Sequence, residues 1–154
     1  MNGNSPGKAG LIYLDDLTVG LVFESTEHQL DAEQIREFAE RFDPQPFHLS
    51  EETARETFFA GLAASGWHTA AITMKLLVQS LPLAGGVIGA GSDITWPHPT
   101  RPGDVLHVVS TIMEIAPSRS RPDRGIVTVQ SETLNQHGEL CQRSVARLLA
   151  FRRS

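Results

Sequence analysis

Hydrophobic and polar positions follow two different periods in the first third of the chain. Residues 21–30 alternate roughly and are rich in β-branched and aromatic side chains, which predicts a first strand. Asp31 is then well placed to cap a helix, and apolar residues continue at helical spacing to Phe42. Pro44 disfavours helical backbone in the residue before it, so we expect the helix to end at Phe42 with Asp43 in the following loop.

Two more helices are expected before the spacing of apolar residues changes from helical to strand-like. Ser50 can cap a short helix over residues 51–57, and Ser65 can cap a long one that continues to Leu81. Apolar side chains cover nearly every side of the long helix, which is typical of a helix buried all round.

The second half of the chain has the period of strands. Strand-like segments are separated by turns rich in proline and glycine, at 87–96, 104–116, 125–135 and 139–152. This order of elements predicts an α+β fold, with one antiparallel sheet wrapped around the long helix. The edges and outer face of such a sheet need cover, and dimerisation is one solution.

Composition narrows the class of protein. The 154 residues are 40% hydrophobic and 20% charged, as expected for one soluble domain over residues 11–154, after a flexible tail at 1–10. No signal peptide or membrane span is predicted, and a net charge of −5 makes nucleic acid a poor partner. Cys141 is the only cysteine, so no intrachain disulfide is expected, and the cytoplasm is the expected compartment.

Several common site motifs are missing. The six histidines fit no zinc spacing, so we expect no metal site. The glycine-rich run at 85–92 precedes a strand and has no following lysine, which excludes a phosphate-binding loop of the usual kind. Residues 63–67 do not form the nucleophile elbow of serine hydrolases.

The first candidate for chemistry is the pair Asp43 and His48. The two residues lie five positions apart in a segment stiffened by Pro44 and Pro46. A carboxylate and an imidazole that converge can position a water and transfer its proton. The residue types alone leave a second interpretation open, in which Asp43 ends a helix and His48 merely precedes the cap at Ser50.

The second candidate is the start of the long helix, at Ser65 and Gly66. The first N–H groups of a helix have no internal partners, and a buried helix start can therefore stabilise a developing oxyanion. Glycine allows a carbonyl to approach the backbone closely. Helix capping by Ser65 is the simpler alternative, and the two roles are compatible.

Taken together, these segments resemble the MaoC-like dehydratases, which include the R-specific enoyl-CoA hydratases of the hotdog fold. The similarity extends from Leu14 to Arg152. It rests on four segments: LDDLTVGLVFES, FDPQPFHLSEETA, GLAASGWHTAA and WPHPTRPGD.

The resemblance implies a hotdog fold and a reversible addition of water to a trans-2-enoyl thioester. It assigns catalysis to Asp43 and His48, and it places the backbone N–H of Gly66 at the thioester carbonyl, with Ser65 at the preceding position. The sequence departs from the family at two places. Gln45 stands where asparagine is usual, and Trp67 stands where a smaller side chain is common, which would narrow the acyl pocket.

The implied ligand is an acyl-CoA or an acyl-carrier thioester. No separate cofactor is expected, because coenzyme A is part of the substrate. Arg119, Arg121 and Arg124 cluster in one loop and could bind its phosphates, although a solvated hairpin tip is the simpler and favoured interpretation. A homodimer or higher homo-oligomer is expected from the family.

Two other functions remain open at this point. A hotdog acyl-CoA thioesterase shares the fold and the ligand but attacks the carbonyl carbon. A non-catalytic acyl-CoA-binding hotdog subunit would bind the ligand without turnover.

Overall fold

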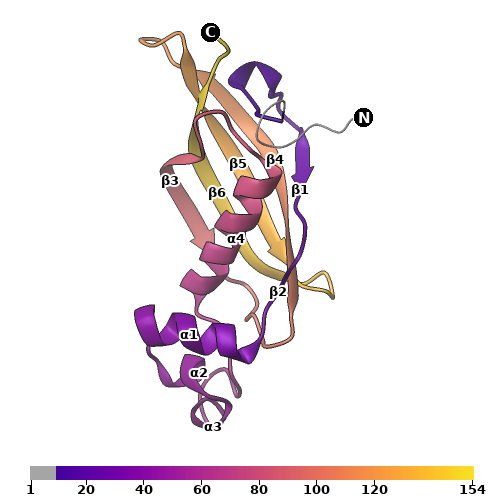
Figure 1. Ribbon diagram of the computed structural model, residues 1–154, viewed down its shortest axis with the longest axis vertical. Coiled ribbons are helices and arrows are strands. Elements are labelled where there is room, and N and C mark those ends of the chain that lie inside the picture. The colour runs from indigo at the N-terminus through magenta and orange to yellow at the C-terminus, as the bar shows by residue number, and fades with distance from the viewer. Residues whose placement is uncertain (1–9) are drawn as a thin grey trace.

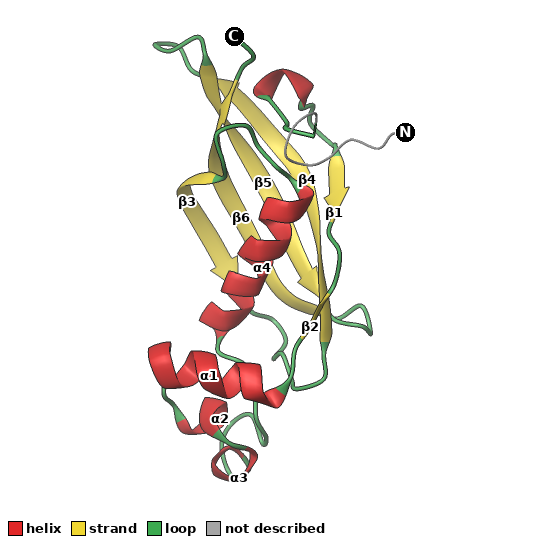
Figure 2. Ribbon diagram, viewed as in Figure 1, coloured by secondary structure: helices red, strands yellow, loops and turns green. Residues whose placement is uncertain are grey.

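A long helix lies across one face of an antiparallel sheet in the computed structural model, which describes residues 10–154 (Figures 1 and 2). The strand order is β1-β4-β5-β6-β3, with β2 beside β4. The expected α+β architecture is therefore confirmed. Of the tail expected at 1–10, residues 1–9 lie outside the described part of the chain.

Three long strands form the centre of the sheet: β4 (Val105–Pro117), β5 (Arg124–Leu134) and β6 (Leu140–Phe151). Each pairs with the next in antiparallel register. The strand β3 (Ile88–Thr95) pairs with β6 and forms one edge, and nearly all of its residues are exposed.

The single strand expected over 21–30 is wrong, because the chain forms two short strands there. These are β1 (Val22–Glu24) and β2 (His28–Gln29), and both pair with β4. Ser25 explains the interruption, since its hydroxyl oxygen accepts the hydrogen bond of the Val108 N–H at 2.8 Å. A side chain thus replaces a backbone partner, and the regular ladder stops.

The long helix α4 (Gly66–Ser80) begins after its cap Ser65, as expected. One face packs on the sheet through Ile72, Leu76 and Leu77, together with Thr73. The opposite face leaves three large apolar side chains exposed, Trp67, Met74 and Val78. The expectation of burial all round is therefore wrong for the single chain, because its own sheet covers only one side of the helix.

Three shorter helices gather at one end of the sheet (Figure 1): α1 (Ala32–Phe42), α2 (Pro46–Leu49) and α3 (Glu51–Ala54). The caps at Asp31 and Ser50 are as expected, but α3 ends before residue 57. The segment expected to be a loop through His48 contains α2, which starts at Pro46. Proline suits a first helical position because its fixed φ is already helical, and a four-residue helix is too short to show a period.

Candidate active site

Asp43 and His48 lie next to each other at the C-terminal end of α1, where the chain continues into α2. Asp43 is the C-cap of α1, and its backbone N–H donates to the carbonyl of Ala39. His48 lies on α2 and is only 4% exposed. Its Nε2 is 3.4 Å from Oδ2 of Asp43. The fold therefore places these two side chains side by side.

The other ring nitrogen of His48 is fixed by the backbone. Nδ1 lies 2.6 Å from the carbonyl oxygen of Ala63. A carbonyl only accepts, so Nδ1 carries the proton, and Nε2 of the neutral ring is left with its lone pair. This lone pair is directed to the side where Asp43 lies.

Ser65 connects the pair Asp43 and His48 to the long helix. Its hydroxyl donates to Oδ2 of Asp43 at 2.7 Å and accepts the N–H of Trp67 at 3.2 Å. Gln45 donates to the other carboxylate oxygen of Asp43. Burial opposes ionisation, but the hydrogen bonds from Gln45 and Ser65 outweigh it, with a smaller charge effect of His48 when its ring is protonated, and the pKa of Asp43 lies below its ordinary value.

Gly66 supplies the first backbone N–H of α4, and no hydrogen-bond partner for it occurs within residues 10–154. It lines a cavity of about 420 Å³ together with His48, Phe58, Phe59 and Trp96. A Cβ atom added to Gly66 would lie 2.7 Å from the indole of Trp96. Only glycine fits there without a shift of the indole.

Arg101 fixes the segment that leads into this helix start. Its guanidinium donates to three backbone carbonyls, of Phe59 at 2.7 Å, Gly61 at 3.1 Å and Leu62 at 3.3 Å. The residues that follow are Ala63, which holds the ring of His48, and Ser65. Arg101 therefore positions the backbone that in turn positions both members of the pair.

The structure brings together Asp43, Gln45, His48, Ser65 and Gly66. Trp67, predicted to narrow the acyl pocket, is 60% exposed and does not line the cavity. Trp96 lines it instead, with its ring packed edge-to-face on that of Trp67.

The arginine cluster lies elsewhere within the chain. The hairpin between β4 and β5 carries Arg119, Arg121 and Arg124 at the end of the sheet opposite α1 to α3 (Figure 1). Arg124 is bound to Asp123 and lies over the ring of Phe151. The described chain therefore does not bring these arginines to the catalytic pair, and their binding of CoA phosphates stays a prediction.

Sequence reasoning did not single out Trp96, Arg101, Phe58 and Phe59. Two of them lie in the segment WPHPTRPGD, which was recognised only as a family feature. Phe58 is 94% exposed at the cavity, and an aromatic pair after a short helix was the available signal. The bonds of Arg101 join residues about 40 positions apart, so the sequence pattern contains no trace of them.

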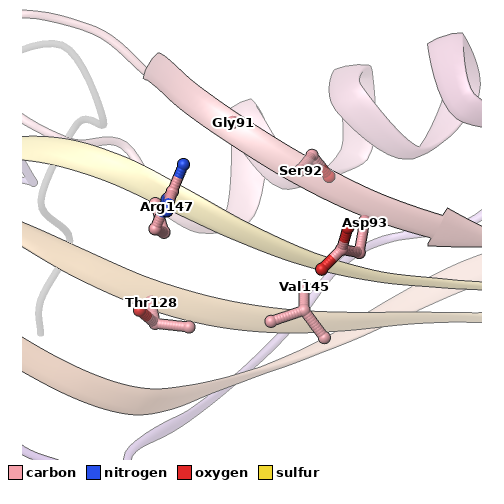
Figure 3. A pocket seen from close by; sticks show the side chains of 6 residues that line it. All are labelled: Gly91, Ser92, Asp93, Thr128, Val145 and Arg147. Carbon is pink, nitrogen blue, oxygen red and sulfur yellow. The ribbon is translucent and has the colours of Figure 1, made fainter.

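Another hollow lies on the face of the sheet turned away from α4, where Asp93, Thr128, Val145 and Arg147 line it (Figure 3). None of the predicted site residues reaches it. Within residues 10–154, no three histidine, cysteine or acidic side chains gather closely enough to bind a metal ion. The helices of this part of the chain are also too short or too polar to span a bilayer.

An antiparallel sheet around a long helix, with a carboxylate and an imidazole at the helix start, defines a hotdog-fold protein of the dehydratase type. Residues 18–135 match the MaoC like domain family. The chain belongs to this family, which confirms the resemblance drawn from its sequence.

Individual relatives agree with this assignment. The chain is 62% identical to a MaoC-like dehydratase from Rhodospirillum rubrum of known crystal structure, with a TM-score of 0.91 over 93% of this chain and 99% of that one. It is 33% identical over 112 residues to a 3-hydroxybutyryl-CoA dehydratase of Methylorubrum extorquens, covering 72% of this chain and 70% of that protein. An unliganded R-hydratase from Pseudomonas aeruginosa gives a TM-score of 0.77 at 25% identity over 93% of this chain and 88% of that one.

Proposed function

We propose that this protein is an (R)-specific enoyl-CoA hydratase, which adds water reversibly to a trans-2-enoyl thioester and acts as a 3-hydroxyacyl-CoA dehydratase in reverse. The observation that carries the proposal is the pairing of Asp43 Oδ2 with His48 Nε2 at 3.4 Å, beside a free helix N–H. The dehydratase and hydratase names of two relatives support the same reaction class.

The pair is suited to hold one water. The carboxylate oxygen and Nε2 are both acceptors, and a water can donate one hydrogen to each of them. The lowered pKa of Asp43 keeps it a charged anchor. The Nε2 lone pair of the neutral His48 ring is the proposed proton acceptor. As the water oxygen bonds to C3, Nε2 takes the proton, and the imidazolium then returns a proton to C2.

The addition also needs a site for negative charge. Attack at C3 moves an electron pair onto the thioester oxygen and forms an enolate. The Gly66 N–H at the positive end of α4 is a fixed donor for that oxygen, and its hydrogen bond strengthens as charge develops. Proton return to C2 then collapses the enolate to the 3-hydroxyacyl product.

We also propose a homodimer formed across α4 and the edge strand β3. Trp67, Met74 and Val78 are exposed on the outer side of α4, and β3 has hydrogen-bonding groups free along its outer edge. A second copy would cover both. Light scattering on the purified chain tests this state, and a monomer at micromolar concentration would contradict it.

The decisive assay follows the loss of enoyl absorbance with crotonyl-CoA, for the wild-type chain and for Asp43→Asn. We expect turnover that falls by about 10²-fold or more in Asp43→Asn, the usual scale for loss of an acid–base group. Asp15→Asn is the matched control, because Asp15 is exposed, lies away from Asp43, and forms an ion pair with Arg152 at 3.7 Å rather than with one of the three arginines of the hairpin. Its turnover should equal that of the wild type.

The same assay separates the alternatives. Release of free thiol without loss of the enoyl group would indicate a thioesterase. Thermal stabilisation by acyl-CoA without any turnover would indicate a binding subunit. Equal turnover of the wild type and Asp43→Asn would contradict the proposed role of the pair.

A further inference from the structure

Two cavities follow one another along α4, and Trp96 lines the first of them. The first, of about 420 Å³, contains the catalytic His48 and Gly66. The second, of about 310 Å³, lies between α4 and the strands β3 and β6, and its lining is mostly apolar, with Met74, Leu77 and Leu148 among its residues. Each is large enough to hold part of a small-molecule ligand. None of the residues assigned to catalysis reaches the second cavity.

The Trp96 indole contacts Gly66 of the first cavity and is hydrogen-bonded to Gln142 of the second. Its face lies on Gly66, where an added Cβ atom would be only 2.7 Å away. Its Nε1–H donates to the side-chain oxygen of Gln142 at 2.9 Å, and Gln142 lines the second cavity and is 1% exposed. Trp96 thus connects the residue that faces the thioester in the first cavity to a buried wall of the second.

This arrangement bears on the length of the acyl chain. Gly66 and Thr69 line the first cavity, and Ala70 and Thr73, further along α4, line the second. A path along this helix is therefore available to the acyl chain of a thioester whose carbonyl binds the Gly66 N–H. The indole contacts Gly66 at the start of this path and bonds Gln142, which lines the second cavity. Because Trp96 is itself 40% exposed, it is not needed to fill the core.

Resting on the proposed hydratase function, we propose that Trp96 separates the two cavities and restricts the enzyme to short-chain 2-enoyl thioesters. Gln142 is the positioning residue that holds the indole across the path. Removal of the indole joins the cavities and admits a longer acyl chain between α4 and the sheet.

The test compares kcat/KM for crotonyl-CoA and oct-2-enoyl-CoA in the wild type, Trp96→Phe and Trp96→Ala. We expect the wild type to prefer crotonyl-CoA, and Trp96→Ala to raise the ratio of long-chain to short-chain kcat/KM by about tenfold or more. Discrimination by a single methylene already reaches this size in hydrophobic pockets. Trp96→Phe should lie between them, because it keeps an aromatic ring but loses the bond to Gln142.

Trp67→Ala is the comparison variant, since it removes the neighbouring exposed indole. The role of Trp96 would be overturned if Trp96→Ala left the ratio of long-chain to short-chain kcat/KM unchanged. It would also be overturned if Trp67→Ala raised that ratio more than Trp96→Ala does. A wild-type enzyme that already prefers oct-2-enoyl-CoA would overturn it as well.

Binding gives a second measurement that does not depend on turnover. Calorimetric titration with butyryl-CoA and octanoyl-CoA should show that Trp96→Ala gains affinity for the octanoyl thioester alone. If no variant turns over any enoyl thioester, the hydratase proposal fails, and this titration still decides whether Trp96 restricts acyl length. Equal gains for both thioesters, or no gain, would contradict the proposal.

Discussion

Ser65 donates its hydroxyl proton to Oδ2 of Asp43 at 2.7 Å, although 22 positions separate the two residues. The hydroxyl oxygen of Ser65 also accepts the N–H of Trp67 and so caps α4. One hydroxyl therefore joins the catalytic carboxylate to the helix whose first N–H is proposed to bind the enolate.

Ser65→Ala should weaken both functions of this hydroxyl. We expect the free energy of unfolding to fall by about 1 kcal/mol through loss of the cap. The pKa of Asp43 should rise, because one hydrogen bond to the carboxylate is lost. Ser65→Thr retains a hydroxyl and should restore most of the activity. Denaturant unfolding and a pH–rate profile measure the two effects, and a variant with wild-type values for both would contradict this role.

The lowered pKa of Asp43 predicts how stability depends on acid. Because the folded-state pKa lies below the ordinary value of 3.8, the folded protein binds fewer protons there than the unfolded chain. This contribution to stability is present above pH 3.8 and is lost as pH falls through the lower folded-state pKa. Urea unfolding of the wild type and Asp43→Asn should therefore converge at the most acidic pH. A constant difference between them would contradict the linkage.

His68 predicts a second acid-sensitive step at higher pH. Its ring stacks on Phe38, its Nδ1 has no partner within the described residues, and burial, with a smaller effect of His28, lowers the pKa of His68 from 6.5 to about 4. The folded state again binds fewer protons than the unfolded chain. Stability is therefore full above pH 6.5 and falls as pH drops toward 4. His68→Phe keeps the stack and removes the proton site, so its unfolding midpoint should vary less across this range. If the unfolding midpoints of the wild type and His68→Phe changed equally with pH, His68 would be ruled out as the cause.

Arg101→Lys should impair the site without touching the substrate. An ammonium cannot reproduce the planar set of donors that bonds Phe59, Gly61 and Leu62. We expect kcat to fall more than KM changes, because the displaced groups are Ala63 and Ser65, which hold the catalytic side chains. The NMR signals of the His48 ring should shift as well. Arg55→Lys, at an exposed position directly after α3, is the control. Equal kcat and KM values for the two variants would contradict the role of Arg101.

Much of the architecture was predictable from local patterns. Asp31, Ser50 and Ser65 marked helix starts because a side-chain cap acts within three residues of itself. The four strands after α4 were predicted close to their observed limits, because alternation is a local property. The pair of Asp43 and His48 was found through its motif in a family resemblance.

Contacts between distant parts of the chain decided the remainder. The period of residues 21–30 could not reveal that the hydroxyl of Ser25 would replace a backbone partner of β4. The apolar pattern of α4 could not reveal that one face stays uncovered in the single chain, because coverage depends on the sheet packed against it. Nor could it show which tryptophan enters the cavity, since Trp67 lies on α4 and Trp96 just after β3, and the two meet only in the fold.

The sequence by itself therefore determined the order of the main helices and strands, the start of α4 and the candidate pair Asp43 and His48. These depend on periodicity, capping and a compact motif within a few neighbouring residues. Tertiary structure decided that Ser65 bonds Asp43, that Arg101 fixes the segment before them and that Trp96 stands at Gly66. The physical reason is that such contacts arise only when side chains far apart in the chain pack around one helix, and no local pattern records them.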